Sequence, residues 1–239
     1  MFLLSKIIAF GGLKASGKDT SADMLQYMLS TPKILHYYWI YKLIGDFVPP
    51  KWSKVSFADT LKASLSVLLD IPVEKFEDRD FKENYYIYFP TLNITNNPPS
   101  VLTLSDKKFS RLCQNKNWDE IITYYLSIRQ VLQMWGTEIV RAHFGDRFWI
   151  MRTISGDENY IISDLRFATE YNDVKKKNGF VYYIDRNGTP GAHPSEQETI
   201  ILKDMNKFDD IIDNTGTLED LFNQLKIKVY GKLRSKALC

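Results

Sequence analysis

The sequence of 239 residues contains only two cysteines, Cys113 and Cys239. Two cysteines cannot build a disulfide framework, and they lack the paired spacing of a structural zinc site. A reducing compartment such as the cytoplasm is therefore the expected location. The chain also lacks an excess of one charge, because 31 basic residues balance 29 acidic ones and leave a net charge of +2. A net charge this small cannot hold a polyanion through counterion release alone. We therefore expect neither a nucleic-acid polymer nor a membrane surface as a partner.

Long apolar runs are absent as well. No window approaches the roughly 18 uninterrupted apolar residues that a membrane-spanning helix needs. Lys6 interrupts the apolar stretch within 1–10, and no convincing small-residue cleavage pattern follows it, which argues against a signal peptide. The composition that is present, 44% hydrophobic and 25% charged residues, is typical of a globular chain. We therefore predict one domain over 1–239.

Short apolar segments alternate with helical patterns along the chain. Strands are expected over 6–10, 54–57, 160–163, 180–184 and 211–213, and helices over 18–29, 59–69, 128–144, 168–177 and 217–230. Asp59 and Thr217 stand where N-terminal caps of two of these helices belong. The alternation predicts an α/β fold, with a parallel sheet covered by helices on both faces.

Three segments interrupt this pattern. Residues 31–53 contain several prolines and aromatics and predict only a partly helical connector. The periodicity weakens from about residue 76 onwards, so we predict a peripheral insertion over 84–126. Residues 186–197 are rich in glycine and proline and are expected to form a loop.

The clearest motif follows the first expected strand. Residues 12–18 match the pattern G-x-x-x-x-G-K of phosphate-binding loops, and lack only the Ser or Thr that usually follows the lysine. In such a loop, backbone N–H groups and the positive end of the next helix meet phosphate oxygens, and Lys18 can reach the β- and γ-phosphates. Asp19 could hold a water of a magnesium ion while Thr20 supplies the hydroxyl, or it could be a favourable acid in the first helical turn. A glycine turn before an ordinary surface helix is the alternative for the whole segment.

Asp164 and Arg166 follow the strand expected over 160–163, at the edge of a parallel sheet where ligands bind. Residues two apart on an extended chain point the same way, so both could face a ligand. The acid would then meet a metal or a sugar hydroxyl, and the arginine a phosphate. An internal ion pair that caps the strand is the alternative.

The helix expected over 128–144 carries a polar face opposite its apolar stripe. Gly136 lies inside this helix, where glycine costs about 1 kcal/mol relative to alanine, so a substrate or a packed helix is expected close to it. Spacing alone favours a solvated surface charge for Arg129 and a core position for Trp149.

Several strings, taken in order, resemble the phage-type deoxynucleoside monophosphate kinases. They are ASGKDTSAD at 15–23, IRQVLQMWGTE at 128–138, FW at 148–149, DLR at 164–166 with Glu170, HPSE at 193–196 and NTGTLEDL at 214–221. The resemblance implies a P-loop kinase three-layer sandwich with a five-stranded parallel sheet, a short lid and a helical acceptor-binding insertion. It also implies Mg²⁺-assisted transfer of the ATP γ-phosphoryl group to a deoxynucleoside 5′-monophosphate such as dGMP or dTMP. Residues 31–53 and 84–126 are not matched.

The resemblance also implies roles for individual residues. Those at the ATP site are Ala15, Ser16, Gly17, Lys18, Asp19, Thr20 and Arg186, with Asp19 and Thr20 also at the metal ion. Those at the acceptor site are Lys14, Lys62, Arg79, Arg129, Gly136, Thr137, Glu138, Trp149, Asp164, Arg166 and Glu170. The catalytic residues would be Lys18, Arg129 and Arg166. Lys14 and Trp149 would enclose the acceptor base, residues 186–197 would be the lid, and 214–216 would sit near adenine.

The resemblance further implies a role in nucleotide biosynthesis in the cytoplasm, that of the host if the protein is viral. It leaves a homodimer open, because family members are often dimers. Two other functions also stay open. One is a different small-molecule kinase of the same architecture, acting on dephospho-coenzyme A or phosphomevalonate. The other is a nucleotide-binding switch that transfers nothing.

Overall fold

The computed structural model describes residues 6–30, 52–92, 121–156, 158–188 and 194–233. The chain divides into two compact units. The first unit combines Met1–Asp59 with Trp149–Cys239, and the second is Thr60–Phe148. The connector expected over 31–53 lies almost wholly outside the described residues, as does the middle of the insertion expected over 84–126. A single domain with that insertion stays a prediction.

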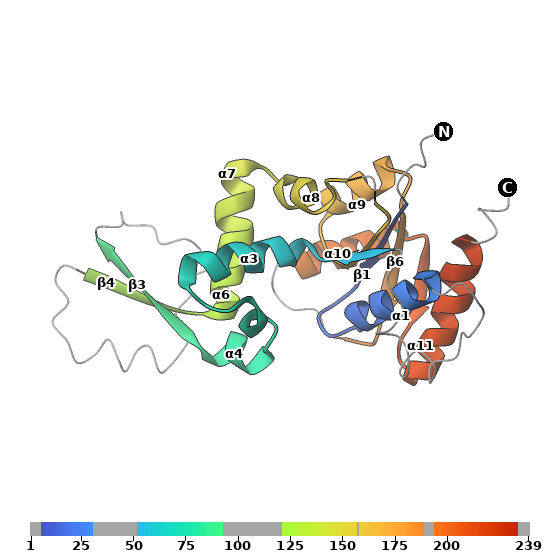
Figure 1. Cartoon of the computed structure of the whole chain (residues 1–239), viewed down its shortest axis with the longest axis horizontal. Coiled ribbons are helices and arrows are strands. Elements are labelled where there is room, and N and C mark those ends of the chain that lie inside the picture. Colours follow the sequence, from blue (N-terminus) through green and yellow to red (C-terminus); the bar gives the residue numbers. More distant parts are fainter. Residues whose placement is uncertain (1–5, 31–51, 93–120, 157, 189–193, 234–239) are drawn as a thin grey trace. The chain divides into compact units, whose positions relative to one another are not determined.

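A five-stranded parallel sheet forms the centre of the first unit (Figure 1). Its strands are β1 (Ile7–Gly11), β2 (Ser53–Val55), β5 (Tyr160–Leu165), β6 (Phe180–Asp185) and β7 (Asp210–Asp213), in the order β2-β5-β1-β6-β7. The central strand β1 pairs with β5 from Ile7 opposite Tyr160, and with β6 from Ile8 opposite Phe180. All four pairings are parallel, so the predicted sheet is confirmed.

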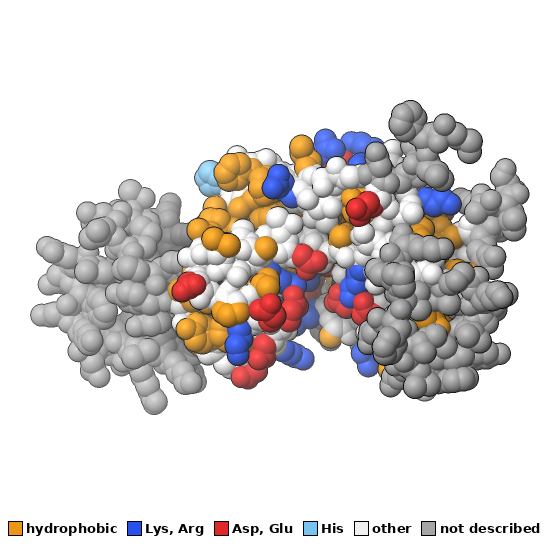
Figure 2. All heavy atoms as spheres, in the orientation of Figure 1, with side chains coloured by type: hydrophobic (Ala, Val, Ile, Leu, Met, Phe, Trp, Pro, Cys, Tyr) orange, Lys and Arg blue, Asp and Glu red, His pale blue; other side chains and the backbone are white. Residues whose placement is uncertain are grey.

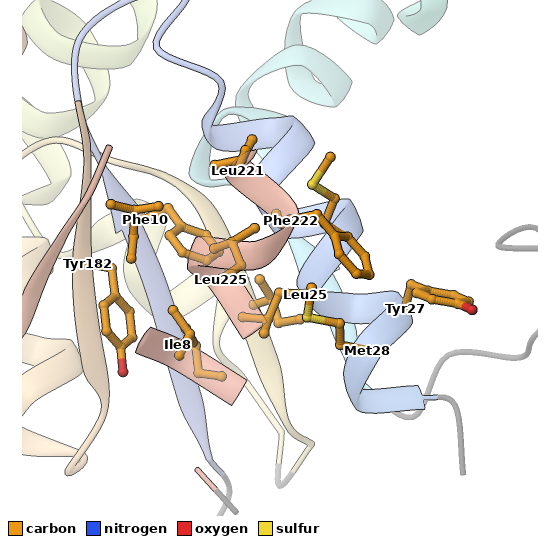
Figure 3. Close-up of a cluster of buried hydrophobic side chains, with 14 of the residues drawn as sticks. Ile8, Phe10, Leu25, Tyr27, Met28, Tyr182, Leu221, Phe222 and Leu225 are labelled. Carbon is orange, nitrogen blue, oxygen red and sulfur yellow. The ribbon is translucent and has the colours of Figure 1, made fainter. Parts of the chain in front are cut away.

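Helices cover both faces of this sheet, as predicted. Helices α1 (Lys18–Ser30) and α11 (Leu218–Leu225) lie on one face, and α9 (Ala168–Lys176) and α10 (Pro194–Asp204) lie on the other (Figure 1). The side chains that fill the space under α1 and α11 are labelled in Figure 3 and include Ile8, Phe10, Tyr182, Leu25, Met28, Leu221, Phe222 and Leu225. Because β1 is buried on both faces, its residues read as one apolar run rather than an alternating pattern.

The helix ends follow from local hydrogen bonding. Thr217 caps α11 in a reciprocal arrangement with Asp220, as its position in the sequence predicts. The cap predicted for α3 (Phe57–Leu69) is wrong. The Ser56 hydroxyl accepts from the N–H of Ala58 at 3.1 Å, and the Asp59 carboxylate accepts from the N–H of Ser56 at 2.9 Å. Ser56 is therefore the cap and Asp59 its helical partner, so the helix begins two residues earlier than expected.

The segment expected to form a loop, 186–197, is partly helical. Residues 186–197 are expected to be a loop, but α10 begins at Pro194, so the last four of these residues are helical. Proline suits the first helical position because its missing N–H is not needed there. Residues 189–193 lie outside the described residues.

The second unit contains the rest of α3 and the segments up to α8 (Phe148–Thr153). Its elements are η2 (Val73–Phe76), α4 (Arg79–Asn84), β3 (Tyr86–Leu92), β4 (Ile121–Ser127), α6 (Ile128–Gln133), η3 (Met134–Arg141) and α7 (Ala142–Phe144). Strands β3 and β4 form an antiparallel pair that the sequence did not predict. The helix predicted over 128–144 is present as α6, η3 and α7, but η3 has π-helical geometry. Among the described residues, no helix is both long enough and apolar enough to cross a membrane.

Candidate functional site

The turn between β1 and α1 has the shape of a phosphate-binding loop. Gly12 and Gly17 have φ values of 143° and 97°, which side-chain-bearing residues rarely adopt. A Cβ atom at Gly12 would lie 2.6 Å from the carbonyl oxygen of Ile184 and 2.7 Å from Oγ of Ser16. Both glycines of the motif are therefore needed by the fold of the turn. The turn delivers the chain directly into the N-terminus of α1, where anions are favoured.

Lys18 is the buried cation of this loop. Its side chain is folded back along the turn, and Nζ donates to the carbonyl oxygens of Gly12 at 2.8 Å and Leu13 at 2.6 Å. The residue is only 7% exposed. Burial and the positive charge of Arg166 lower the pKa of Lys18 to about 8, although nearby acids act in the opposite direction. Those acids are Asp164, Asp19 and Glu196. The acids do not offset burial and Arg166, so an anionic ligand would be favoured here.

Asn214 holds the loop in place from the end of β7. Its side-chain Nδ2 donates to the carbonyl oxygen of Ser16 at 2.7 Å, and its own N–H donates to the carbonyl oxygen of Asp185 at 2.7 Å. Nδ2 also lies so close to Gly17 that a Cβ atom there would collide with it. The sequence gives no local signal for this contact except that Asn214 follows the last strand, at the same edge of the sheet as the loop.

Asp164 contacts the N-terminus of a helix. Its Oδ1 accepts from the N–H of Phe57 at 2.8 Å, while Oδ2 accepts from the hydroxyl of Ser56 at 2.7 Å and from the N–H of Ala58 at 3.0 Å. These contacts satisfy N–H groups that have no partner within α3. The carboxylate therefore joins the end of β5 to the start of α3. Its predicted contact with a metal ion or sugar stays a prediction.

The backbone of Arg166 is held by hydrogen bonds on both sides, and its side chain is half-buried. The buried Glu170 accepts, through Oε2, the N–H groups of Arg166 at 2.8 Å and Phe167 at 3.1 Å, and so caps α9. The Thr199 hydroxyl donates to the carbonyl oxygen of Arg166 at 2.9 Å. Within the described part of the chain, the guanidinium of Arg166 makes no hydrogen bond or ion pair. It is therefore available to an anion near Lys18.

Asp19 and Thr20 fit a magnesium site of the kind found in kinases. Asp19 is exposed in the first turn of α1, with Oδ1 3.9 Å from Nζ of Lys54, which pairs more closely with Asp23 at 2.6 Å. The described residues contain no group of three His, Cys, Asp or Glu side chains that could hold a metal alone. Mg²⁺ commonly needs only one or two protein oxygens, because substrate phosphates and waters complete its shell. The Asp19 carboxylate and the Thr20 hydroxyl are suitable oxygens.

The other residues expected at the nucleotide have different surroundings. Lys14 is exposed, whereas Trp149 is only 4% exposed. The two predicted partners of the acceptor base therefore differ in their exposure to solvent. Arg186 is exposed just beyond β6. The roles of all three stay predictions.

The second unit holds the other residues expected at the acceptor. Nζ of Lys62 lies 2.6 Å from Oε1 of Glu77, and Nε of Arg129 lies 2.6 Å from Oε1 of Glu83. Figure 2 shows basic and acidic side chains side by side over the region of α4. Arg79 is exposed at the start of α4.

The polar residues of η3 are less exposed. A Cβ atom at Gly136 would lie 3.0 Å from Cδ2 of Leu61, so close helix packing accounts for this glycine. Thr137 follows Gly136 and is half-buried. Burial raises the pKa of Glu138, and its Oε2 is buried without a hydrogen-bond partner among the described residues.

Comparison with known proteins identifies the family. A model described as deoxynucleotide monophosphate kinase matches residues 70–225, more than half of the chain. The chain belongs to the deoxynucleotide monophosphate kinase family. This is a family of phosphotransferases, so the resemblance seen in the sequence and the predicted enzyme class are confirmed. The matched range begins after residues 12–18, so the geometry of the phosphate-binding loop is separate support.

Three relatives and one solved structure illustrate what the chain is similar to. The deoxynucleotide monophosphate kinases of Escherichia phage RB69 and Enterobacteria phage T4 are each 24% identical over 92% of this chain, and the alignments cover 98% and 97% of those proteins. A putative deoxynucleotide monophosphate kinase of Acanthamoeba polyphaga mimivirus is 25% identical over 51% of this chain and 71% of its own. A dephospho-CoA kinase from Campylobacter jejuni is 13% identical, with a TM-score of 0.38 over 96% of this chain and 98% of its own.

Proposed function

We propose that this protein transfers the γ-phosphoryl group of ATP to a deoxynucleoside 5′-monophosphate such as dGMP or dTMP, giving ADP and the deoxynucleoside diphosphate. The observation that carries the proposal is the loop over 12–18, whose two left-handed glycines lead to the buried Lys18 beside Arg166. Membership of the family supplies the class of acceptor.

The donor side needs alignment and positive charge more than a reactive side chain. Lys18 leaves the carbonyl oxygens of Gly12 and Leu13 to meet the β- and γ-phosphates, and the N–H groups at the start of α1 meet the remaining oxygens. Asp19 and Thr20 would hold the Mg²⁺ ion, and the ion would neutralise part of the phosphate charge when bound. Asn214 keeps the loop in the required shape.

The acceptor side also needs no protein nucleophile, because the phosphate of the acceptor is already anionic. Arg166 steadies the transferred group, since its guanidinium has no partner among the described residues and lies near Lys18. Lys62 and Arg129 neutralise the acceptor phosphate. Closure of the segment that carries Arg186 excludes water that would otherwise take the phosphoryl group. We also propose that the enzyme works in nucleotide biosynthesis in the cytoplasm. Its assembly as a homodimer stays a prediction.

A panel of nucleotides tests this function. The purified protein is mixed with Mg-ATP and, one at a time, with each ribo- and deoxynucleoside monophosphate and with dephospho-coenzyme A, and ADP release is followed by a coupled assay. We expect release in proportion to dGMP or dTMP, with the matching diphosphate detected by chromatography. The Lys18→Met variant should keep the fold and lose this turnover. If no nucleoside monophosphate raises ADP release above background hydrolysis, the proposed function is wrong.

A further inference from the structure

In the second unit, two acidic side chains each form an ion pair with a basic side chain. Glu77 pairs with Lys62, from the helix α3, and Glu83 pairs with Arg129, from α6, each at 2.6 Å. Glu83 belongs to α4, so this short helix lies beside α6. The two pairs involve side chains of α3, α4 and α6, and the charges of all four residues act on one further side chain, Lys82. We call these five residues the charged cluster.

A third cation, Lys82, belongs to the same cluster. It precedes Glu83 on α4 and is half-buried. Burial lowers the pKa of Lys82, and the charges of Arg129 and Lys62 lower it too, whereas Glu77 and Glu83 raise it. In the part of the chain that the structure describes, its ammonium has no hydrogen bond and no acid within 4 Å.

Three of these five residues are cations and two are acids, and among the described residues Lys82 is the cation that makes no ion pair. A half-buried ammonium with cations as neighbours is costly unless a counter-ion reaches it. The two acids whose charges act on Lys82, Glu77 and Glu83, already have ion-pair partners. An anion that accepts from several donors at once fits this surplus charge.

We propose that Lys82, together with Lys62 and Arg129, binds the doubly charged phosphate of the acceptor nucleotide. This inference rests on the proposed function and adds a residue that the resemblance did not assign. A phosphate monoester carries nearly two negative charges above its second pKa of about 6, and its three terminal oxygens are strong acceptors. The phosphate supplies the counter-ion that Lys82 lacks, and the two existing ion pairs hold the neighbouring cations in position for it.

The test compares Lys82→Met with a matched control, Lys75→Met. Lys75 is an exposed lysine on η2 in the same unit. Binding of dGMP and of deoxyguanosine, which lacks the phosphate, is measured by calorimetry, and steady-state kinetics gives KM for dGMP and for ATP. If the wild-type enzyme prefers dTMP, then dTMP and thymidine take their place.

We expect Lys82→Met to weaken dGMP binding and raise its KM by about 10- to 100-fold, as the loss of one charge-assisted contact predicts. Deoxyguanosine binding and KM for ATP should stay unchanged, Lys82→Arg should recover part of the loss, and Lys75→Met should match the wild type. Equal losses for dGMP and deoxyguanosine, or no loss for dGMP, would overturn the assignment.

The binding measurements by calorimetry distinguish a failure of this inference from a failure of the proposed function. If the wild-type protein turns over no monophosphate but binds dGMP, the kinase function fails, and the comparison of dGMP with deoxyguanosine still decides the role of Lys82. If the wild-type protein turns dGMP over and Lys82→Met behaves like it, only the role of Lys82 is wrong. If the wild-type protein binds no nucleoside monophosphate, both are wrong.

Discussion

Binding of Mg-ATP is expected to take up protons through Lys18. Burial and Arg166 lower the pKa of Lys18 to about 8 in the protein without nucleotide. Phosphates next to the ammonium favour its charged form and raise this pKa again. Linkage then predicts uptake of about 0.1 proton at pH 7, about 0.5 at pH 8 and about 0.9 at pH 9.

The assay is calorimetric titration of Mg-ATP into the protein in buffers of different ionisation enthalpy. The slope of the observed enthalpy against the ionisation enthalpy gives the number of protons taken up. The matched variant is Lys18→Arg, because a guanidinium stays charged over this range and cannot take up a proton. A wild-type slope of zero at pH 8, or the same slope in wild type and variant, would refute the reasoning.

A stability measurement checks the same pKa without nucleotide. The folded-state pKa of about 8 lies below the ordinary value of 10.5, so the unfolded chain binds more protons between these values. The unfolding free energy of the wild type, relative to Lys18→Met, should therefore be constant below pH 8 and rise by about 3 kcal/mol between pH 8 and 10.5. Urea unfolding of both proteins measures this difference. A flat difference across that range would contradict the buried ammonium.

Three further substitutions test the surroundings of the loop. Asn214→Asp replaces the amide donor to Ser16 with a carboxylate, so KM for ATP should rise about tenfold, with KM for the acceptor unchanged; equal changes in steady-state kinetics would argue against a loop contact. Gly17→Ala forces a Cβ atom onto the Asn214 amide at a positive φ, and should lower the unfolding free energy in urea by about 1–3 kcal/mol. Asp164→Asn removes part of the cap of α3 and should cost about 1–2 kcal/mol in the same assay; unchanged stability would exclude the cap.

The elements that could be predicted from sequence are those with local causes. The loop over 12–18 and helix α1 follow from the spacing of two glycines and a lysine after an apolar strand. The end of α9 follows from Asn178, which has a φ of 56°, and Gly179, whose N–H donates to the carbonyl oxygen of Val174.

Elements with distant causes were missed. Strands β3 and β4 are separated by the 28 residues 93–120, so no short turn links them in the sequence. The contacts of Asp164 involve residues 106 to 108 positions earlier, which spacing cannot reveal. The start of α10 was hidden because glycines and prolines precede it, although Pro194 and Glu196 are typical of a first helical turn.

The order of strands in the sheet also sets when the nucleotide site can form during synthesis. Strand β1 is made first, but Ile7 pairs with Tyr160, and Lys6 bonds Asn159, across a separation of 153 residues. At about 5–20 residues per second, ribosomes need roughly 8–30 s to cover that distance. During that time β1 has no partner strand. Asn214, which follows Ser16 by 198 residues, is synthesised later still. A nascent chain that ends with β7 therefore lacks Asn214 and its contact with Ser16, so we expect the loop to reach its final shape only late in synthesis.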